Sequence, residues 1–394
     1  MPESQQRSPI LMLVLVALGA AGGFLLGRRG SPATEAPPPA AAAPAADSTP
    51  LGLTESGERL DAAQGWKAPT KVAVWDFWPG RTAELAQVAP GVEVVVANSA
   101  SALAAAAVDA DAVMGPLSPE VWQEATRLRW VQLPYAGVER PLAIPGVRES
   151  DVMLSNAQRI YAEGLAEHAM AMVLGLARRL PTALALQREH RWDSEPLIGA
   201  GPSGQGGPFV ELNGRTLLVA GLGGIGTEIA RLAHGMGMRV VATRGSSRAG
   251  PDFVEYVGLA DELPKLAAEA DVIVNVVPLT KATERIFDGA FFDQAKRGAL
   301  FVNVGRGRSV DTDALVAALR DGRIGGAALD VTDPEPLPAA SPLWSMPNVI
   351  ITPHVAGGES DGDLKRLWVL FEENLRRFAT GGRLLSVVDK ARGY

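Results

Sequence analysis

The stretch RTLLVAGLGGIGTEIA, residues 215–230, decides the fold of this chain. It places an apolar strand, three glycines at the spacing GxGxxG and a helix start in direct succession. That order presents backbone N–H groups to the pyrophosphate of a dinucleotide. The glycine spacing alone is a weak signal, so the interpretation depends on the strand before it and the helix after it. The predicted dinucleotide-binding residues here are Gly221, Gly223, Gly224, Ile225 and Gly226.

Strand-like and helix-compatible segments alternate on both sides of this stretch. KVAVW, GVEVVVA, DAVMG and LRWVQLP precede it, and MRVVAT, DVIVNVV, ALFVNV and GGAALD follow it. This alternation predicts an α/β protein with two Rossmann-like domains, each a doubly wound parallel sheet. The last helical segment, 358–380, follows the dinucleotide-binding domain and is expected to return to the first domain. The predicted domains are therefore 69–160 together with 357–394, and 161–356.

The N-terminal part differs in composition from the rest. Residues 10–27, ILMLVLVALGAAGGFLLG, carry no charge and are just long enough to span a bilayer, and Arg28 and Arg29 follow. We predict a membrane anchor in residues 1–30, with the later domains in the cytoplasm. A cleaved signal peptide, which would export the protein, and a mis-assigned start, which would leave it soluble, are the alternatives. Residues 31–68, rich in Pro and Ala, are expected to be a disordered linker.

Composition narrows the function classes. The 394 residues carry a net charge of −7, which argues against nucleic acid as a partner. The chain has no cysteine and only four histidines, none of them paired at metal-ligand spacing. We therefore expect no metal site.

The end of the strand after the glycine turn predicts the cofactor. An acidic residue about twenty positions past the turn normally binds the ribose 2′-hydroxyl. This chain instead has the basic and hydroxylated run Arg244, Ser246, Ser247 and Arg248. Arginine and hydroxyl groups suit a 2′-phosphate. NADP(H) is the expected preference, with NAD(H) possible.

Three short signatures near the end carry residues suited to proton transfer. They are Arg306 in FVNVGRGRSVD, Glu335 in ALDVTDPEP and His354 in TPHVAG. Together these side chains can polarise a carbonyl and give it a proton. Combined with a dinucleotide site, they indicate hydride transfer.

These motifs, in this order, resemble the D-isomer-specific 2-hydroxyacid dehydrogenases, and among them the glyoxylate/hydroxypyruvate reductase type. The resemblance covers nearly everything after residue 70 and includes LPYAGVE, AEHAMAMVLGLARRLP, VVPLTKAT and NVGRG. It implies that the first domain binds substrate. It also implies that Arg306 binds the substrate carbonyl and carboxylate, that His354 is the acid/base, and that Glu335 hydrogen-bonds this histidine.

The resemblance implies further contacts. A glycine-containing loop would bind the substrate carboxylate through backbone N–H groups, and Asp330 would lie near the nicotinamide. His168 is left out of catalysis as a helix residue with a local partner. The substrate loop is Tyr135, Ala136 and Gly137; the remaining cofactor residues are Pro278, Thr283, Val304, Gly305 and Asp330.

The substrate is expected to be a small 2-oxo acid such as glyoxylate or hydroxypyruvate, and a larger 2-oxo acid is an alternative. Aromatic residues near the first strand, Trp75, Phe77 and Trp78, either restrict the pocket or pack in the core. A homodimer is implied by the resemblance. The hypothesis from another class is a membrane-tethered, cofactor-dependent sensing protein with little turnover.

Overall fold

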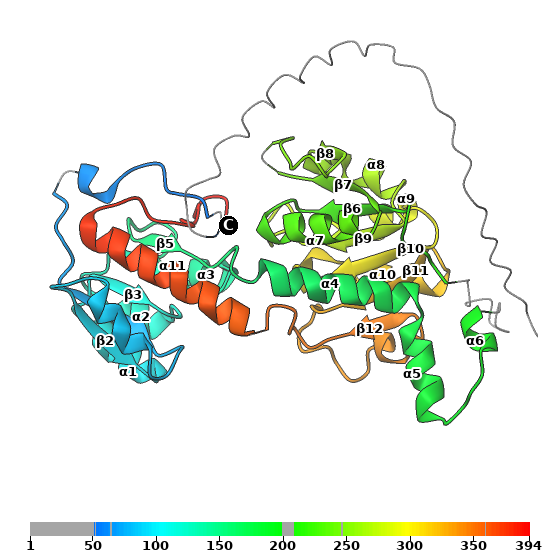
Figure 1. Ribbon diagram of the computed structural model, residues 1–394, viewed down its shortest axis with the longest axis horizontal. Coiled ribbons are helices and arrows are strands. Elements are labelled where there is room, and N and C mark those ends of the chain that lie inside the picture. The colour runs from blue at the N-terminus through cyan, green and yellow to red at the C-terminus, as the bar shows by residue number, and fades with distance from the viewer. Residues whose placement is uncertain (1–50, 52, 64, 199–208, 246, 359) are drawn as a thin grey trace, which may run out of the picture. The chain divides into compact units, whose positions relative to one another are not determined.

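The computed structural model describes residues 51–394 except 52, 64, 199–208, 246 and 359. Two sheets organise them, and every pairing between their strands is parallel (Figure 1). The predicted class of two Rossmann-like α/β domains is confirmed. The five-stranded sheet has the order β2-β1-β3-β4-β5, with β1 (Lys71–Trp75), β2 (Glu93–Ala97), β3 (Ala112–Met114), β4 (Trp130–Gln132) and β5 (Met153–Ser155).

The seven-stranded sheet contains the glycine turn. Its order is β12-β11-β10-β9-β6-β7-β8. Strands β7 and β8 are added on one side of β6, and strands β9 to β12 are added on the other side. Ligands bind at the carboxyl ends of the strands where the order switches sides in this way. The glycine turn follows β6 directly. The strands are β6 (Thr216–Ala220), β7 (Arg239–Thr243), β8 (Tyr256–Gly258), β9 (Val272–Asn275), β10 (Ala299–Asn303), β11 (Ile324–Leu329) and β12 (Val349–Ile351).

The burial of strand β6 shows that helices cover both faces of this sheet. All five of its residues are buried, and successive side chains point to opposite faces. Leu217 and Val219 join the core under α4 (Ala162–Ala177) and α7 (Gly224–Gly235). Leu218 and Ala220 join the other core, whose helices are α8 (Leu263–Ala267), α9 (Gly289–Gln294) and α10 (Thr312–Arg320). A continuous apolar strand therefore holds the glycine turn from both sides.

The chain crosses between the two sheets twice. It enters the seven-stranded part through α4 and returns through α11 (Asp361–Thr380), whose start is a capping box between Ser360 and Asp363. Leu367, Phe371 and Phe378 of α11 pack in the same core as β1. The other helices are α1 (Ala100–Ala107), α2 (Pro119–Glu124), α3 (Glu139–Ala143), α5 (Leu180–Arg188), α6 (Glu195–Ile198), and the 3-10 helices η2 (Leu60–Ala62), η3 (Thr82–Gln87), η4 (Ala260–Glu262), η5 (Gly307–Ser309) and η6 (Pro342–Ser345).

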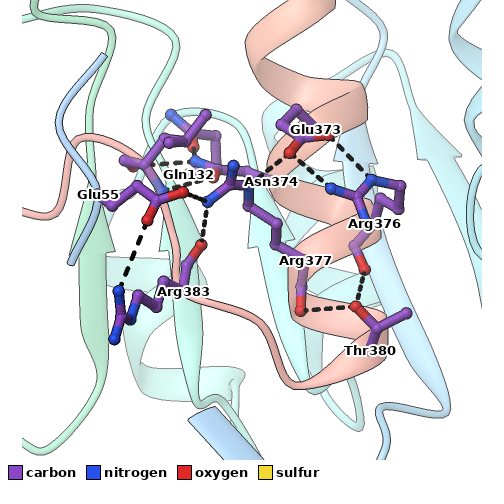
Figure 2. A network of polar contacts seen from close by, with 9 residues as sticks. Glu55, Gln132, Glu373, Asn374, Arg376, Arg377, Thr380 and Arg383 are labelled. Atoms are coloured by element: carbon purple, nitrogen blue, oxygen red, sulfur yellow. Dashed lines mark hydrogen bonds and ion pairs between the residues drawn. The ribbon is translucent and has the colours of Figure 1, made fainter. Parts of the chain in front are cut away.

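The end of the predicted linker belongs to the folded domain. Leu53 is 2% exposed, and with Leu60 it packs in the core that contains β1 and α11. The Glu55 carboxylate lies 2.6 Å from Arg377 and 3.9 Å from Arg383 (Figure 2). The prediction of a disordered linker up to residue 68 is therefore wrong from Leu53 onward, because buried leucines and an ion pair hold this segment.

The predicted anchor, residues 1–30, and the linker up to residue 50 lie outside the described residues. Among the helices that the structure describes, none is by itself long and apolar enough to cross a membrane. The pair α4 and α5, bent by 71° at the break between them, passes that test on length and composition alone.

Candidate active site

One cavity collects residues from both sheet domains. Its volume is about 880 Å³, within the usual size of a ligand site. It is lined by the substrate loop, the glycine turn, Arg306, Asp330 and His354. The predicted site residues that line this cavity are Tyr135, Ala136, Gly137, Gly221, Gly223, Gly224, Ile225, Gly226, Pro278, Val304, Gly305, Arg306, Asp330 and His354.

The glycine turn has the geometry that the motif requires. Gly221 has φ +106, and a Cβ there would lie 2.9 Å from the Val276 carbonyl oxygen. A Cβ on Gly226 would lie 2.2 Å from the Gly221 carbonyl oxygen, so glycine lets α7 approach β6 closely. Gly223 caps α7 without any side-chain hydrogen bond to the first turn. The first N–H groups of α7 are thus placed to receive an anion.

The residues predicted to bind a 2′-phosphate differ in how strongly they are held. Arg244 donates to the Ala249 carbonyl at 3.1 Å. Arg248 lies 2.6 Å from the Glu262 carboxylate and also donates to the Tyr256 hydroxyl at 2.8 Å. Hydrogen bonds from the Tyr256 hydroxyl and the Leu259 amide lower the pKa of Glu262 to about 2. Because the Glu262 carboxylate is ionised, it would compete with a cofactor phosphate for Arg248. Arg244 instead donates to a neutral backbone carbonyl.

Two serines complete this loop in the sequence. Ser247 accepts a long hydrogen bond from the Ala249 amide, 3.4 Å. Ser246 lies outside the described residues. The contact of Ser247 is compatible with a phosphate site.

Of the remaining predicted cofactor residues, Thr283 has a different place. Its hydroxyl donates to the Pro278 carbonyl at 2.5 Å and accepts from the Thr280 amide at 2.8 Å. It does not line the cavity. Thr283 therefore stabilises the turn that carries Pro278, a local role that the motif VVPLTKAT did not reveal. Gly305 lies tightly against the backbone after β9, where a Cβ would be 3.2 Å from Val276 Cα.

His354 and Glu335 form the expected pair. His354 Nδ1 lies 2.6 Å from Glu335 Oε1, with half of the histidine side chain and 41% of the glutamate exposed. The carboxylate engages Nδ1, which leaves Nε2 as the nitrogen available for proton exchange. His354 lines the cavity and Glu335 does not. The arrangement suits a histidine that reacts and a glutamate that orients its ring.

Arg306 reaches the substrate loop. Its Nε donates to Glu139 Oε1 at 2.9 Å and its Nη1 donates to the Gly305 carbonyl at 2.8 Å. A Cβ on Gly137 would lie 2.2 Å from Arg306 Nη2, so only glycine allows this approach. Glu139 was not among the predicted residues. The acidic residue that ends LPYAGVE was the available signal for it.

Asp330 holds the loop that carries His354. Its carboxylate accepts from the Thr352 hydroxyl at 2.6 Å and from the N–H groups of Val355 and Ala356 at 2.9 and 3.0 Å. His168 Nε2 lies 3.1 Å from the Thr352 hydroxyl. The local partner expected for His168 is therefore wrong, because its partner lies on the catalytic loop. Thr352 is the first residue of the TPHVAG motif, whose predicted role was assigned to His354 alone.

A metal site is not suggested by the side chains. Within the part of the chain that the structure describes, no group of three or more His, Asp or Glu side chains could hold a metal ion. Tyr135 lines the cavity, and burial raises the pKa of its hydroxyl.

A dinucleotide turn, a histidine paired with a glutamate and an arginine around one cavity are the features of a nicotinamide-dependent oxidoreductase. The family model for the D-isomer specific 2-hydroxyacid dehydrogenase NAD binding domain matches residues 170–356. A glyoxylate reductase of Korarchaeum cryptofilum is 33% identical over 284 residues, 69% of this chain and 81% of that protein. The chain belongs to the D-isomer specific 2-hydroxyacid dehydrogenase family.

Solved structures agree. An NADPH-dependent glyoxylate/hydroxypyruvate reductase of Sinorhizobium meliloti, solved with NADP and sulfate, has a TM-score of 0.69 and 30% identity, covering 82% of this chain and 100% of that one. A probable 2-hydroxyacid dehydrogenase of Rhizobium etli, solved with NADP, HEPES and tartaric acid, has a TM-score of 0.67 and 26% identity, covering 83% and 100%. The protein is an NAD(P)-dependent D-2-hydroxyacid dehydrogenase.

Proposed function

We propose that this enzyme reduces small 2-oxo monocarboxylic acids, of the glyoxylate and hydroxypyruvate type, to D-2-hydroxy acids. The observation that carries the proposal is the placement of Arg306, the His354–Glu335 pair and the glycine turn around one cavity. Trp75 and Phe77 line the same cavity, and their aromatic rings support a preference for a short substrate chain. Relatives named glyoxylate reductase support this substrate class.

The residues divide the reaction between them. Arg306 binds the substrate carboxylate and carbonyl oxygen through its planar guanidinium. NAD(P)H held at the glycine turn would supply the hydride that the carbonyl carbon receives. His354 gives the proton on Nε2 to the carbonyl oxygen, while Glu335 stays on Nδ1 and keeps the ring oriented. The carbonyl of the 2-oxo acid thereby becomes the hydroxyl of the 2-hydroxy acid. The half-exposed His354 regains its proton from solvent.

The chain's own residues fit a dinucleotide. The glycines at 221, 226 and 305 leave room that a Cβ would fill, and the start of α7 has no side-chain cap. Arg244, with one hydrogen bond to a backbone carbonyl, supports a preference for NADP(H) over NAD(H). The Sinorhizobium meliloti and Rhizobium etli proteins were solved with NADP, which supports the same preference.

The test is a steady-state assay of the full chain. Oxidation of NADPH and of NADH would be followed with glyoxylate, hydroxypyruvate, pyruvate and 2-oxoglutarate, in the wild type and in His354→Asn. We expect turnover with the small monocarboxylates, faster with NADPH, and a loss of kcat of about 100-fold to 10,000-fold in the variant. Tight cofactor binding without turnover on any substrate would instead favour the sensing hypothesis.

We infer a localisation from the N-terminal composition. The uncharged residues 10–27 and the arginines after them support an anchor that keeps the catalytic domains at the cytoplasmic membrane face. Fractionation of the full chain and of a chain lacking residues 1–30 tests this. The anchor predicts that detergent, and not high salt, releases the full chain, and that the shortened chain is soluble. A full-length gene product found shortened and exported would indicate a signal peptide.

Homodimerisation is part of the proposal. Leu180 and Leu184 of α5 and Trp192 after it are exposed apolar side chains on one arm, which supports a self-association surface. Light scattering of the purified catalytic part during gel filtration would give the mass. Leu184→Asp would lower it to that of a monomer if the arm is the interface.

A further inference from the structure

A buried polar network lies at the carboxyl ends of β9 and β10, next to the cavity. Asn275 ends β9 and Asn303 ends β10, and the two residues are partners in the register of these neighbouring strands. Together with Ser309 of η5, they are at most 1% exposed. The reaction described above uses none of the three. Burying a polar side chain costs free energy that an apolar side chain would not, so their presence here needs a reason.

The three side chains hydrogen-bond to one another. The Asn275 Nδ2 group donates to Asn303 Oδ1 at 2.9 Å and to Ser309 Oγ at 2.7 Å. Every polar atom of the three side chains has a hydrogen-bond partner. Such a network is rigid, because the loss of any bond would leave a buried donor or acceptor unpaired in a medium of low dielectric constant.

Two further hydrogen bonds of this network hold the backbone of Arg306. Asn303 Nδ2 donates to the Arg306 carbonyl at 3.2 Å, and Ser309 Oγ donates to the same carbonyl at 2.6 Å. Asn303 Oδ1 also accepts from the Gly305 amide at 3.1 Å, and the Gly305 carbonyl in turn accepts from Arg306 Nη1 at 2.8 Å. The network therefore fixes both the backbone from which the Arg306 side chain starts and one acceptor of its guanidinium.

The network also reaches the cofactor side of the cavity. Asn275 Oδ1 accepts from the Val277 amide at 3.1 Å, and Val277 lines the cavity. The preceding residue, Val276, lies against the glycine turn, where a Cβ on Gly221 would be 2.9 Å from its carbonyl oxygen. One set of buried hydrogen bonds thus joins the loop beside the glycine turn to the arginine expected to bind the substrate.

We propose that Asn303 and Ser309, supported by Asn275, are positioning residues for Arg306. They do not line the cavity, so they act on the substrate only through the arginine. Their hydrogen bonds present its guanidinium to the substrate in one orientation. A displacement of about 1 Å in such a group can cost about 100-fold in rate. The inference rests on the proposed role of Arg306 in binding the 2-oxo acid.

The experiment uses two matched substitutions at Ser309 in the full chain. Ser309→Thr keeps the hydroxyl, whereas Ser309→Val replaces it by a methyl group in a side chain of similar shape. The measurements are kcat/KM for glyoxylate with NADPH, the Kd for NADPH from its fluorescence, and the melting temperature. Ser309→Val is expected to have a kcat/KM about tenfold below that of Ser309→Thr, with Kd values for NADPH that agree within about twofold.

Two further variants separate positioning from a loss of stability. Ser309→Ala removes the hydroxyl without adding volume, so it gives the same comparison with the wild type if the larger side chains do not fold. Thr82→Val is the control, because Thr82 is 1% exposed and its hydroxyl donates to the Trp78 carbonyl at 3.1 Å, away from Arg306. This control is expected to lower the melting temperature and to leave kcat/KM unchanged.

A double-mutant cycle tests whether the network acts through Arg306. Lysine has a flexible ammonium group in place of the planar fork, so its orientation depends less on a fixed backbone. In an Arg306→Lys background, Ser309→Val is therefore expected to change kcat/KM by less than about threefold.

The inference is overturned if Ser309→Val and Ser309→Ala both keep the wild-type kcat/KM. It is also overturned if they lower kcat/KM equally with and without Arg306, or raise the Kd for NADPH by the same factor. These results would leave the role of Arg306 intact if Arg306→Lys is itself impaired. An Arg306→Lys variant as active as the wild type would instead contradict the proposed function of the arginine, and this inference with it.

Discussion

His354 has a left-handed backbone conformation, φ +54, which residues other than glycine rarely adopt. The surrounding contacts explain how it persists. The His354 amide donates to the Asp330 carbonyl at 2.8 Å, and the Asp330 carboxylate takes the next two amides. Strain at a reacting residue is kept only where neighbours over-determine it. Asp330 is that neighbour here.

Asp330→Asn is therefore expected to lower kcat/KM for glyoxylate by about 10-fold to 100-fold, because the amide nitrogen cannot accept from a loop N–H and His354 shifts. The measurement is steady-state kinetics together with the KM for NADPH. Asp313→Asn, at an exposed position of α10, is the control. An unchanged kcat/KM would show that Asp330 does not hold the histidine.

The cofactor loop allows a second test on single residues. Arg244→Ala is expected to reduce kcat/KM for NADPH by about 10-fold to 100-fold and to leave NADH within a few-fold, since a charged hydrogen bond to phosphate contributes about 1.5–3 kcal/mol. Arg248→Ala is expected to have a smaller effect, because Glu262 already holds that guanidinium. Equal losses with both cofactors in Arg244→Ala would contradict a 2′-phosphate role.

Among the secondary-structure elements, short-range patterns were predictable and long-range partners were not. The strand, turn and helix at 216–235 are local, so apolar periodicity and glycine spacing predict them. The contact between Arg306 and Glu139 joins residues 167 apart, and that between His168 and Thr352 joins residues 184 apart. No local pattern encodes such pairs, which is why the positioning residues were missed.

The order of the residues from Leu53 onward was not predictable for a related reason. Proline and alanine dominate residues 31–50, and the few leucines after them did not look sufficient for packing. Their burial depends on the core formed by β1 and α11, which lies far along the sequence. Composition describes a segment by itself and says nothing about a surface that other segments provide.

The start of β6 gives a prediction for acid stability. Asp271 precedes β9 and accepts from the Thr216 amide at 3.0 Å and from Lys296 at 2.8 Å. Burial alone would raise the pKa of Asp271, but the hydrogen bonds from Lys296 and Thr216 outweigh it and the pKa lies below its usual value. A depressed pKa in the folded state means that the carboxylate stabilises the fold above the unfolded pKa of about 3.9.

Asp271→Asn is expected to lower the free energy of unfolding by about 1–2 kcal/mol at pH 7. The difference from wild type stays constant down to about pH 5 and then decreases as the pH falls through the folded pKa of Asp271. Urea unfolding across this pH range measures it, with the exposed Asp252→Asn as control. A difference that grows on acidification would contradict the sign of the pKa shift.

For the whole molecule, the segment before β1 connects distant parts of the substrate domain. The Ser56 amide donates to the Leu384 carbonyl at 2.7 Å, and the Ser386 amide donates to the Thr54 carbonyl at 2.8 Å. Beside these bonds, Asn374 of α11 donates from its buried amide to Gln132 of β4 at 2.7 Å (Figure 2). Residues 53–63 thus form an outer layer over α11 and the segment after it.

Removal of residues 1–68 is therefore expected to destabilise the protein, whereas removal of residues 1–47 is not. Each buried leucine lost, Leu53 and Leu60, contributes about 2–5 kcal/mol, and each kcal/mol lowers the melting temperature by about 2–4 °C. Thermal unfolding of the two shortened chains measures the difference, and Leu53→Ala within the longer one separates packing from chain length. Glu58→Ala, at an exposed position of the same segment, is the control.

Because the segment covers α11, which returns from the dinucleotide-binding domain, its loss should also raise the KM for substrate more than that for NADPH. Equal melting temperatures would mean that the segment does not stabilise the fold, and that the stable part of the enzyme begins at β1.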